Sequence, residues 1–319
     1  MLKTLSTIAL ALTLLSCNTF KIAERHFDKK MANSDLTKSI WINSEVGDTV
    51  EYWDNKNMDK PVLVLVHGFG ASTKYQWAKQ VKVLTENYRL ILPNLFQFGN
   101  TKPGSEKYGV DDQVNLVHSL TEYLKLKKYS LMGVSYGGLI SMELANEYQS
   151  EIDKLIILDA PIKYMDSNDI NTVTAYFNAT SIEELFVPEK PEGIKKLLYL
   201  ATGKKSHVPK GAFKRFHEEV YLKNLYEMRS LITEMMGSLE EYQEREYELE
   251  MPILLIWGEG DKAIPADRGR KLKEHLGENA RFRSIEKSAH MPNMTKHKEF
   301  NALLLEFLSD ELSSSDNQY

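Results

Sequence analysis

The chain has 319 residues, of which 42% are apolar and 27% charged, a composition typical of a globular protein with a large core. Its formal charge of −5 and isoelectric point of about 6.0 exclude the broad basic surface that nucleic-acid phosphates require, so we expect no nucleic-acid partner. At this length we predict one main domain with an insertion.

The chain begins with Lys3, an apolar run over residues 5–15 and the small residue Ser16 before Cys17. This pattern predicts a secretory signal peptide over residues 1–16, since the run is shorter than the roughly 20 residues of a membrane-spanning helix. Leu-Leu-Ser-Cys17 resembles the bacterial lipobox, whose cysteine becomes the lipidated first residue of the mature protein. The resemblance implies an exported lipoprotein, anchored to a membrane of the bacterial cell envelope through Cys17.

Cys17 is the only cysteine, so an exported chain could form no internal disulfide. Acylation accounts for this residue better than packing does, although an ordinary signal peptide that contains a cysteine remains the alternative. Residues 17–39 are polar and charged with little periodicity, and we interpret them as a tether. The Ser-rich, acidic end of the chain predicts a disordered tail over residues 313–319.

Continuous apolar runs of strand length follow, and they lack the alternation of half-exposed strands. They lie at Val62–Val66, Leu90–Leu92, Ser130–Val134, Leu155–Leu158 and Ile253–Trp257. Segments with helical spacing separate them, at Trp77–Leu84, Val114–Leu124, Leu139–Tyr148, Arg270–Leu276 and Phe300–Leu308. Strands buried on both faces by helices are expected to be parallel. The alternation therefore predicts an α/β fold with a mostly parallel, doubly wound sheet, built from residues 40–160 and 251–312.

This alternation stops between residues 161 and 250, where the sequence indicates helices and loops without a convincing strand. Ninety residues are too many for one crossover, so we predict a helical lid inserted after the sixth strand. The segment is rich in tyrosine, phenylalanine and methionine. We expect most of these side chains to pack within the lid, and some to supply apolar walls for a small-molecule site.

The sequence Gly133-Val-Ser135-Tyr-Gly137 closes one predicted strand and opens a predicted helix, which is the context of a nucleophile elbow. So sharp a turn strains the serine backbone and requires neighbours without colliding side chains. A capping serine in a glycine-rich turn is the alternative, which the strand-to-helix context disfavours. Ser135 is the candidate nucleophile.

A serine hydroxyl needs a base, and the base needs an orienting carboxylate. His290 follows the predicted last strand near residues 281–285 and is the candidate base, whereas His67 is expected to shape a glycine-containing loop whose amides face an oxyanion. Asp261, on the loop after strand Ile253–Trp257, is the candidate acid. Asp159 and Glu259 remain open as alternative acids.

Five segments together resemble the α/β-hydrolase family, and more narrowly its capped, esterase- and lipase-like members. They are His67-Gly-Phe-Gly70, Pro93–Gly99, Gly133–Gly137, Trp257–Asp261 and Ser288–His290. The order Ser, Asp, His along the chain is the order of that family. The resemblance implies Ser135 as nucleophile, His290 as general base and acid, Asp261 as orienting carboxylate, and the backbone amides of Phe69 and Tyr136 as the oxyanion hole.

The chain departs from the family pattern at Asn94, where aspartate is usual, and at Phe96-Gln97, where Pro-Gly is common. Both departures concern the pocket rather than the triad. A serine at the elbow also disfavours the dehalogenase and epoxide hydrolase branches, which need an aspartate there.

We therefore expect hydrolysis of a carboxylic ester through an acyl-enzyme on Ser135, without a metal or organic cofactor. The expected partner is a small molecule with an apolar acyl or alcohol group. Amide or peptide hydrolysis of the aminopeptidase kind and carbon–carbon bond hydrolysis use the same triad and remain alternatives. So does a lipid-anchored binding protein that has lost catalysis.

Overall fold

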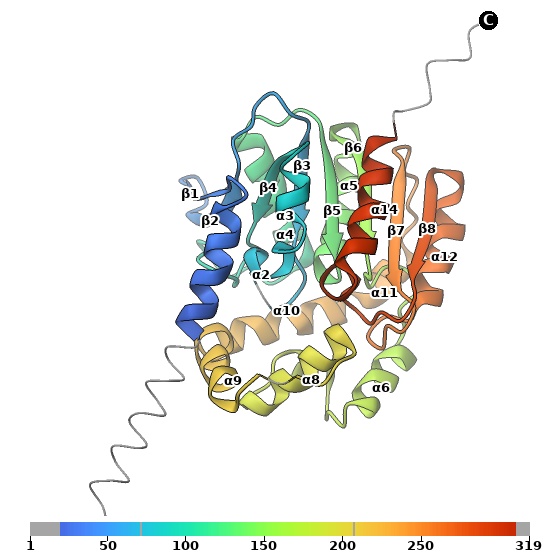
Figure 1. The fold of residues 1–319 in the computed structure, drawn as a ribbon. Coiled ribbons are helices and arrows are strands. Elements are labelled where there is room, and N and C mark those ends of the chain that lie inside the picture. Colours follow the sequence, from blue (N-terminus) through green and yellow to red (C-terminus); the bar gives the residue numbers. More distant parts are fainter. Residues whose placement is uncertain (1–19, 71, 207, 311–319) are drawn as a thin grey trace, which may run out of the picture.

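The computed structural model describes residues 20–310 apart from residues 71 and 207 (Figure 1). The predicted signal peptide, the candidate lipidation site Cys17 and the predicted tail over residues 313–319 lie outside the described residues. Within them, no helix has both the length and the apolar character needed to cross a membrane.

Eight strands form one sheet in the order β1-β2-β4-β3-β5-β6-β7-β8. Every pairing from β4 through β8 is parallel, while β1 and β2 extend the β4 edge by antiparallel pairing. The strands are β1 (Thr37–Asn43), β2 (Asp48–Asp54), β3 (Val62–Val66), β4 (Arg89–Pro93), β5 (Tyr129–Val134), β6 (Ile152–Leu158), β7 (Ile253–Gly258) and β8 (Ala280–Ile285). The predicted mostly parallel sheet is confirmed.

Helices cover both faces of the sheet, so successive residues of a central strand enter two different cores. In β3, Leu63 and Leu65 pack with the first group of helices, and Val64 and Val66 with the second. The first group comprises α2 (Thr73–Trp77), α3 (Val81–Leu84) and α14 (His297–Ser309), and the second α4 (Val110–Tyr123), α5 (Tyr136–Glu147) and α12 (Ala266–Leu276). Burial on both sides explains why the strand sequences show no polar alternation.

The residues between β6 and β7 form helices, which gather beyond one end of the sheet (Figure 1). These helices are α6 (Ser167–Tyr176), α7 (Ile182–Phe186), α8 (Pro191–Thr202), α9 (Lys210–Phe216), α10 (Leu225–Gly237) and α11 (Leu239–Glu244). A π-helical turn, η2 (His217–Tyr221), and a 3-10 turn, η3 (Leu222–Asn224), join α9 to α10. We refer to α6–α11 as the lid.

The tether predicted over residues 17–39 is wrong for its described part. Residues 20–32 form a helix and β1 begins at Thr37. The helix carries Phe20, Phe27 and Met31 at spacings of seven and four, which place them on one helical face. Met31 is fully buried in the core with α2 and α3. Apolar contacts therefore fix a segment that its high charge made look unstructured.

The helix predicted over Trp77–Leu84 is interrupted. Helix α2 ends at Trp77 and α3 begins at Val81, and the chain turns between them. The start of α2 is fixed by Asn94, whose Oδ1 accepts the Thr73 amide at 2.8 Å. A tertiary hydrogen bond therefore sets the start of α2, which local periodicity does not reveal.

Candidate active site

Ser135 lies at the sharp turn between β5 and α5. Its backbone has φ of +52° and ψ of −123°, and its amide donates to the carbonyl of Leu158 at 2.8 Å. The positive φ is strained for a residue with a side chain and is kept only where the surroundings enforce it. They do so here because a Cβ on Gly137 would lie 2.3 Å from the His67 carbonyl oxygen, and one on Gly133 would lie 2.1 Å from the Gly137 carbonyl oxygen.

The structure brings the three candidate triad residues together. His290 Nε2 lies 2.9 Å from Ser135 Oγ, and His290 Nδ1 lies 2.7 Å from Asp261 Oδ2. The three residues follow β5, β7 and β8, whose carboxyl ends share one edge of the parallel sheet. With Nδ1–H donating to Asp261, Nε2 is left to accept the serine proton.

Asp261 is held in place on its other oxygen. Its Oδ1 accepts the amides of Ala263 at 2.7 Å and Ile264 at 3.1 Å, and the Ile264 carbonyl accepts the indole N–H of Trp257. The carboxylate is buried, so its negative charge is stabilised by these donors and by His290 rather than by water. Oδ2 is thereby directed at the imidazole.

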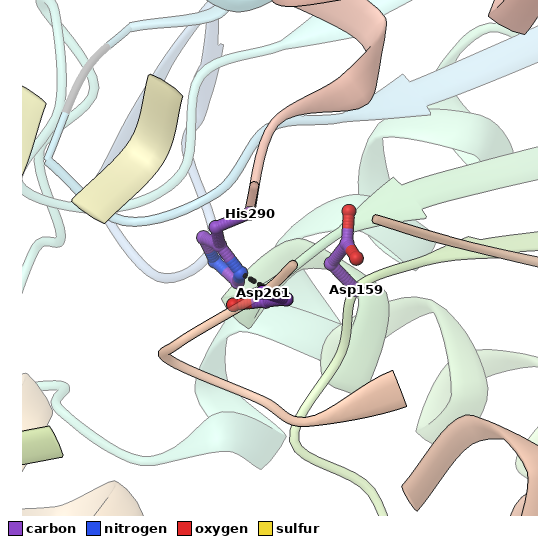
Figure 2. Close-up of side chains that lie close together, drawn as sticks. All are labelled: Asp159, Asp261 and His290. Carbon is purple, nitrogen blue, oxygen red and sulfur yellow. Dashed lines mark hydrogen bonds and ion pairs between the residues drawn. The ribbon is translucent and has the colours of Figure 1, made fainter. Parts of the chain in front are cut away.

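Asp159 is a second buried carboxyl beside the triad, and Figure 2 shows it next to Asp261 and His290. It directly follows β6 with φ of +45°, and its Oδ1 accepts the Gly258 amide at 2.8 Å. Burial, together with the negative charge of Asp261, holds the pKa of Asp159 well above its ordinary value. The neutral, protonated form of Asp159 is therefore favoured.

The donor atoms of Asp159, Asp261 and His290 lie within 4.8 Å of one another, a spacing that would also suit a metal ion. The triad already uses most of them, because His290 bonds Asp261 and Ser135 through its two nitrogens. A metal bound by either nitrogen would have to displace the hydrogen bond that this nitrogen makes in the triad. We therefore assign this cluster to the triad.

The other two alternatives raised by the sequence have different tasks. Glu259 is far more exposed than Asp261 and pairs with Arg270 at 2.7 Å. His67 is fully buried, with Nδ1 2.7 Å from the Gly68 carbonyl and Nε2 accepting the Leu95 amide at 3.0 Å. Burial lowers the pKa of His67 to about 4, so this neutral imidazole joins the loops after β3 and β4.

The two predicted oxyanion donors lie on segments that meet at the elbow. Phe69 is in the loop after β3, and Tyr136 is the first residue of α5. Across residues 20–310, leaving aside 71 and 207, neither backbone amide has a hydrogen-bond acceptor. The Phe69 and Tyr136 rings pack edge to face with centroids 6.2 Å apart. Both amides are therefore available to an anionic oxygen.

Two apolar cavities meet at the candidate triad. The larger, of about 260 Å³, and the smaller, of about 30 Å³, share Phe69, Ser135, Phe186 and His290 as lining residues. Helix α8, Phe216, Tyr221 and Met291 are among the walls of the larger cavity, whereas Ile232, Met235 and Met236 are among the walls of the smaller one. Met165 also lines the smaller cavity, and the other aromatic and methionine side chains of residues 161–250 line neither cavity.

Sequence reasoning missed several residues of this site. Phe27 lines the larger cavity although its segment was predicted to be a tether, and its spacing from Met31 was the available sign of a helix. Asn94, a departure from the family pattern, is a structural residue whose Nδ2 donates to Glu51 at 2.6 Å. Ile194 on α8 carried no local signal, because only the lid's packing brings it to the cavity.

A doubly wound sheet whose carboxyl edge carries this serine, histidine and aspartate under a helical lid is the architecture of the α/β hydrolases. The chain belongs to that family, because the family profile described as alpha/beta hydrolase fold matches residues 61–297. The protein is accordingly a hydrolase, and its predicted resemblance to the family is confirmed.

Relatives and solved structures agree with this family. The chain is 27% identical to Lipase 3 of Moraxella sp. over 284 residues, which cover 86% of this chain and 88% of the relative. It is 24% identical to a monoacylglycerol lipase of Homo sapiens over 268 residues, covering 81% and 78%. The crystal structure of a membrane phospholipase A superposes with a TM-score of 0.76 at 19% identity, covering 97% and 98%.

Proposed function

We propose that this hydrolase cleaves carboxylic esters through an acyl-enzyme on Ser135. The observation that carries the proposal is the series of hydrogen bonds from Asp261 through His290 to Ser135, which ends in an apolar cavity. Similarity to proteins named as lipases supports an ester as the substrate.

In the first step Ser135 Oγ attacks the ester carbonyl carbon while His290 Nε2 takes its proton, and Asp261 stabilises the imidazolium. The carbonyl oxygen becomes an anion, and the amides of Phe69 and Tyr136 donate to it. One such donor is worth roughly 3 kcal/mol of barrier. The bond to the alcohol oxygen then breaks as His290 returns the proton to it.

In the second step His290 takes a proton from water, which attacks the acyl-enzyme carbonyl. Collapse of the second tetrahedral intermediate releases the carboxylic acid and restores Ser135. The larger cavity suits the acyl chain, because its walls are mainly aliphatic and aromatic side chains, and its polar lining groups besides Ser135 and His290 are the amide of Gln76 and the hydroxyls of Tyr75 and Tyr221. Burying an acyl chain there supplies about 0.8 kcal/mol of binding per methylene.

The proposal is tested with p-nitrophenyl esters of graded chain length, matched anilides and a carbon–carbon bond substrate. We expect ester turnover by the unmodified protein, a loss of several orders of magnitude in Ser135→Ala, and fluorophosphonate labelling of Ser135 alone. Undiminished ester turnover by the variant would refute the mechanism. Faster turnover of anilides or diketones would assign one of the alternative reactions, and a folded protein that resists the probe would indicate a binding protein.

We also propose that the enzyme is exported and anchored to a bacterial envelope membrane by a lipid on Cys17. Support comes from the sequence alone, namely Lys3, the apolar run over residues 5–15 and the single cysteine. The full chain should incorporate labelled palmitate in a bacterial host and partition into detergent, whereas Cys17→Ser should do neither. Equal labelling of the two proteins would exclude this anchor.

A further inference from the structure

The helix over residues 20–32 reaches the proposed substrate cavity. Phe27 is half-buried and lines the larger cavity together with Tyr75 of α2 and Phe216 of α9. The Phe27 and Tyr75 rings meet edge to face with centroids 4.9 Å apart, and Tyr75 meets Phe216 in the same way at 6.2 Å. A segment outside the matched hydrolase region therefore contributes an aromatic wall to the site.

The aromatic wall formed by Phe27, Tyr75 and Phe216 also borders a second cavity through Tyr75. Tyr75 lines the apolar cavity on one side and, on the other, a separate polar cavity of about 420 Å³ that also contacts Phe20 and Glu24 of the helix. Tyr75 thus borders both the apolar cavity and a polar space, whereas Phe27 lines only the apolar cavity. Removing the Phe27 ring would enlarge the apolar cavity at this wall.

Ion pairs hold the helix in this position. Lys74, the residue before Tyr75, bonds Glu24 at 2.8 Å and Asp28 at 2.9 Å. Burial by itself would lower the pKa of Lys74, but its hydrogen bonds to Asp28 and Glu24 outweigh burial and raise it, so the ammonium stays charged. Met31 adds a fully buried apolar contact, which makes the helix a fixed wall of the folded protein.

We propose that Phe27 is a specificity-determining residue, which limits the length of the acyl chain that the larger cavity accepts. The proposal rests on the proposed ester hydrolysis and deepens it by naming the residue that selects among acyl chains. An acyl chain that reaches Phe27 has filled the cavity, so further methylene groups of the substrate gain no buried surface. Without the ring, each additional methylene that becomes buried raises kcat/KM about fourfold, which corresponds to about 0.8 kcal/mol.

The experiment compares Phe27→Ala and Phe27→Trp with Ile22→Ala, a matched control on the exposed face of the same helix. Each protein is assayed with p-nitrophenyl esters of C2 to C16 acids. In Phe27→Ala the acyl-chain length with the highest kcat/KM should increase by at least two carbons. The ratio of kcat/KM for this longer ester to kcat/KM for the ester preferred by the unmodified protein should rise by at least tenfold. Phe27→Trp should shift the optimum to shorter chains. Unchanged profiles in both variants, or an equal shift in Ile22→Ala, would overturn the proposal.

A binding measurement separates this proposal from the esterase mechanism. Binding of C8 to C16 fatty acids is measured by calorimetry in the Ser135→Ala background, with and without Phe27→Ala. A longer optimal fatty acid in the double variant supports the role of Phe27 even where no ester is turned over, and an unchanged optimum contradicts it. Thermal unfolding of every variant identifies loss of fold. If Phe27→Ala does not fold, Lys74→Met provides a second perturbation of the wall, because it removes the ion pairs to Glu24 and Asp28. Lys74→Met should also lengthen the preferred fatty acid, and an unchanged preference counts against the wall.

Discussion

Replacing Asp261 by Asn tests the proposed orienting role of this carboxylate towards His290, with little change in shape. The Asn Oδ1 can still accept the amides of Ala263 and Ile264, so the loop keeps its hydrogen bonds. Only the contact with His290 changes, because an amide N–H₂ replaces the Oδ2 that accepts from Nδ1 at 2.7 Å. The imidazole must then carry its proton on Nε2, which faces Ser135 Oγ and can no longer take the serine proton.

The loss follows from this wrong tautomer. The same substitution in a Ser-His-Asp protease lowers kcat about 10⁴-fold, or about 5.5 kcal/mol of barrier. We expect a loss of this size because Asp261 and His290 are both buried, which leaves no water to replace the carboxylate. Asp159 is poorly suited to take over, because His290 Nδ1 bonds Asp261 and burial raises the pKa of Asp159, which disfavours its charged form. Initial rates on a short p-nitrophenyl ester and the rate of fluorophosphonate labelling should fall together.

Asp159→Asn is the matched control, since it changes a neighbouring buried carboxyl in the same way. Its Oδ1 can still accept the Gly258 amide, and we expect its kcat to stay within about tenfold of the unmodified enzyme, because an amide resembles a neutral carboxyl. If Asp159→Asn abolishes turnover while Asp261→Asn retains more than a tenth of it, Asp159 is the orienting acid and the assignment is refuted.

Two further predictions concern stability. In Gly137→Ala the new Cβ would lie 2.3 Å from the His67 carbonyl oxygen, so the free energy of unfolding in urea should fall by about 3 kcal/mol. An unchanged urea midpoint would show that the elbow tolerates a side chain. The pKa of His67 falls from 6.5 to about 4 on folding because the ring is buried, so below pH 6.5 the unfolded chain binds the extra proton. The unfolding free energy should therefore decrease by about 3 kcal/mol as the pH falls from 6.5 to 4, and His67→Gln should lack this contribution. Parallel pH dependences of the two proteins would contradict the shift.

The catalytic geometry could be predicted from sequence because each residue follows a recognisable strand. Ser135, Asp261 and His290 come after β5, β7 and β8, and parallel strands bring such positions to one edge of the sheet. The glycines around Ser135 were informative because a Cβ there would collide with backbone. Choosing Asp261 over Asp159 was a matter of position in the sequence, and the structure adds the reason that only Asp261 bonds His290.

The pocket could not be predicted in the same way. Its walls come from side chains on separate lid helices, and their meeting depends on packing angles that local periodicity does not encode. Phe186 lines both cavities, whereas Tyr226 remains exposed, although each is an aromatic residue of the lid directly preceded by a leucine. The helix over residues 20–32 was missed because the apolar face formed by Phe20, Phe27 and Met31 in a charged segment gives a weak pattern.

The unequal sizes of the two cavities bear on which molecule can accept the acyl group from Ser135. About 10–15 Å³ of such volume is needed for one water molecule, so the smaller cavity of about 30 Å³ holds roughly two. With an acyl chain in the larger cavity, the smaller cavity still has room for water beside Ser135 and His290. On the proposed mechanism, this space suits the water that attacks the acyl-enzyme in the second step.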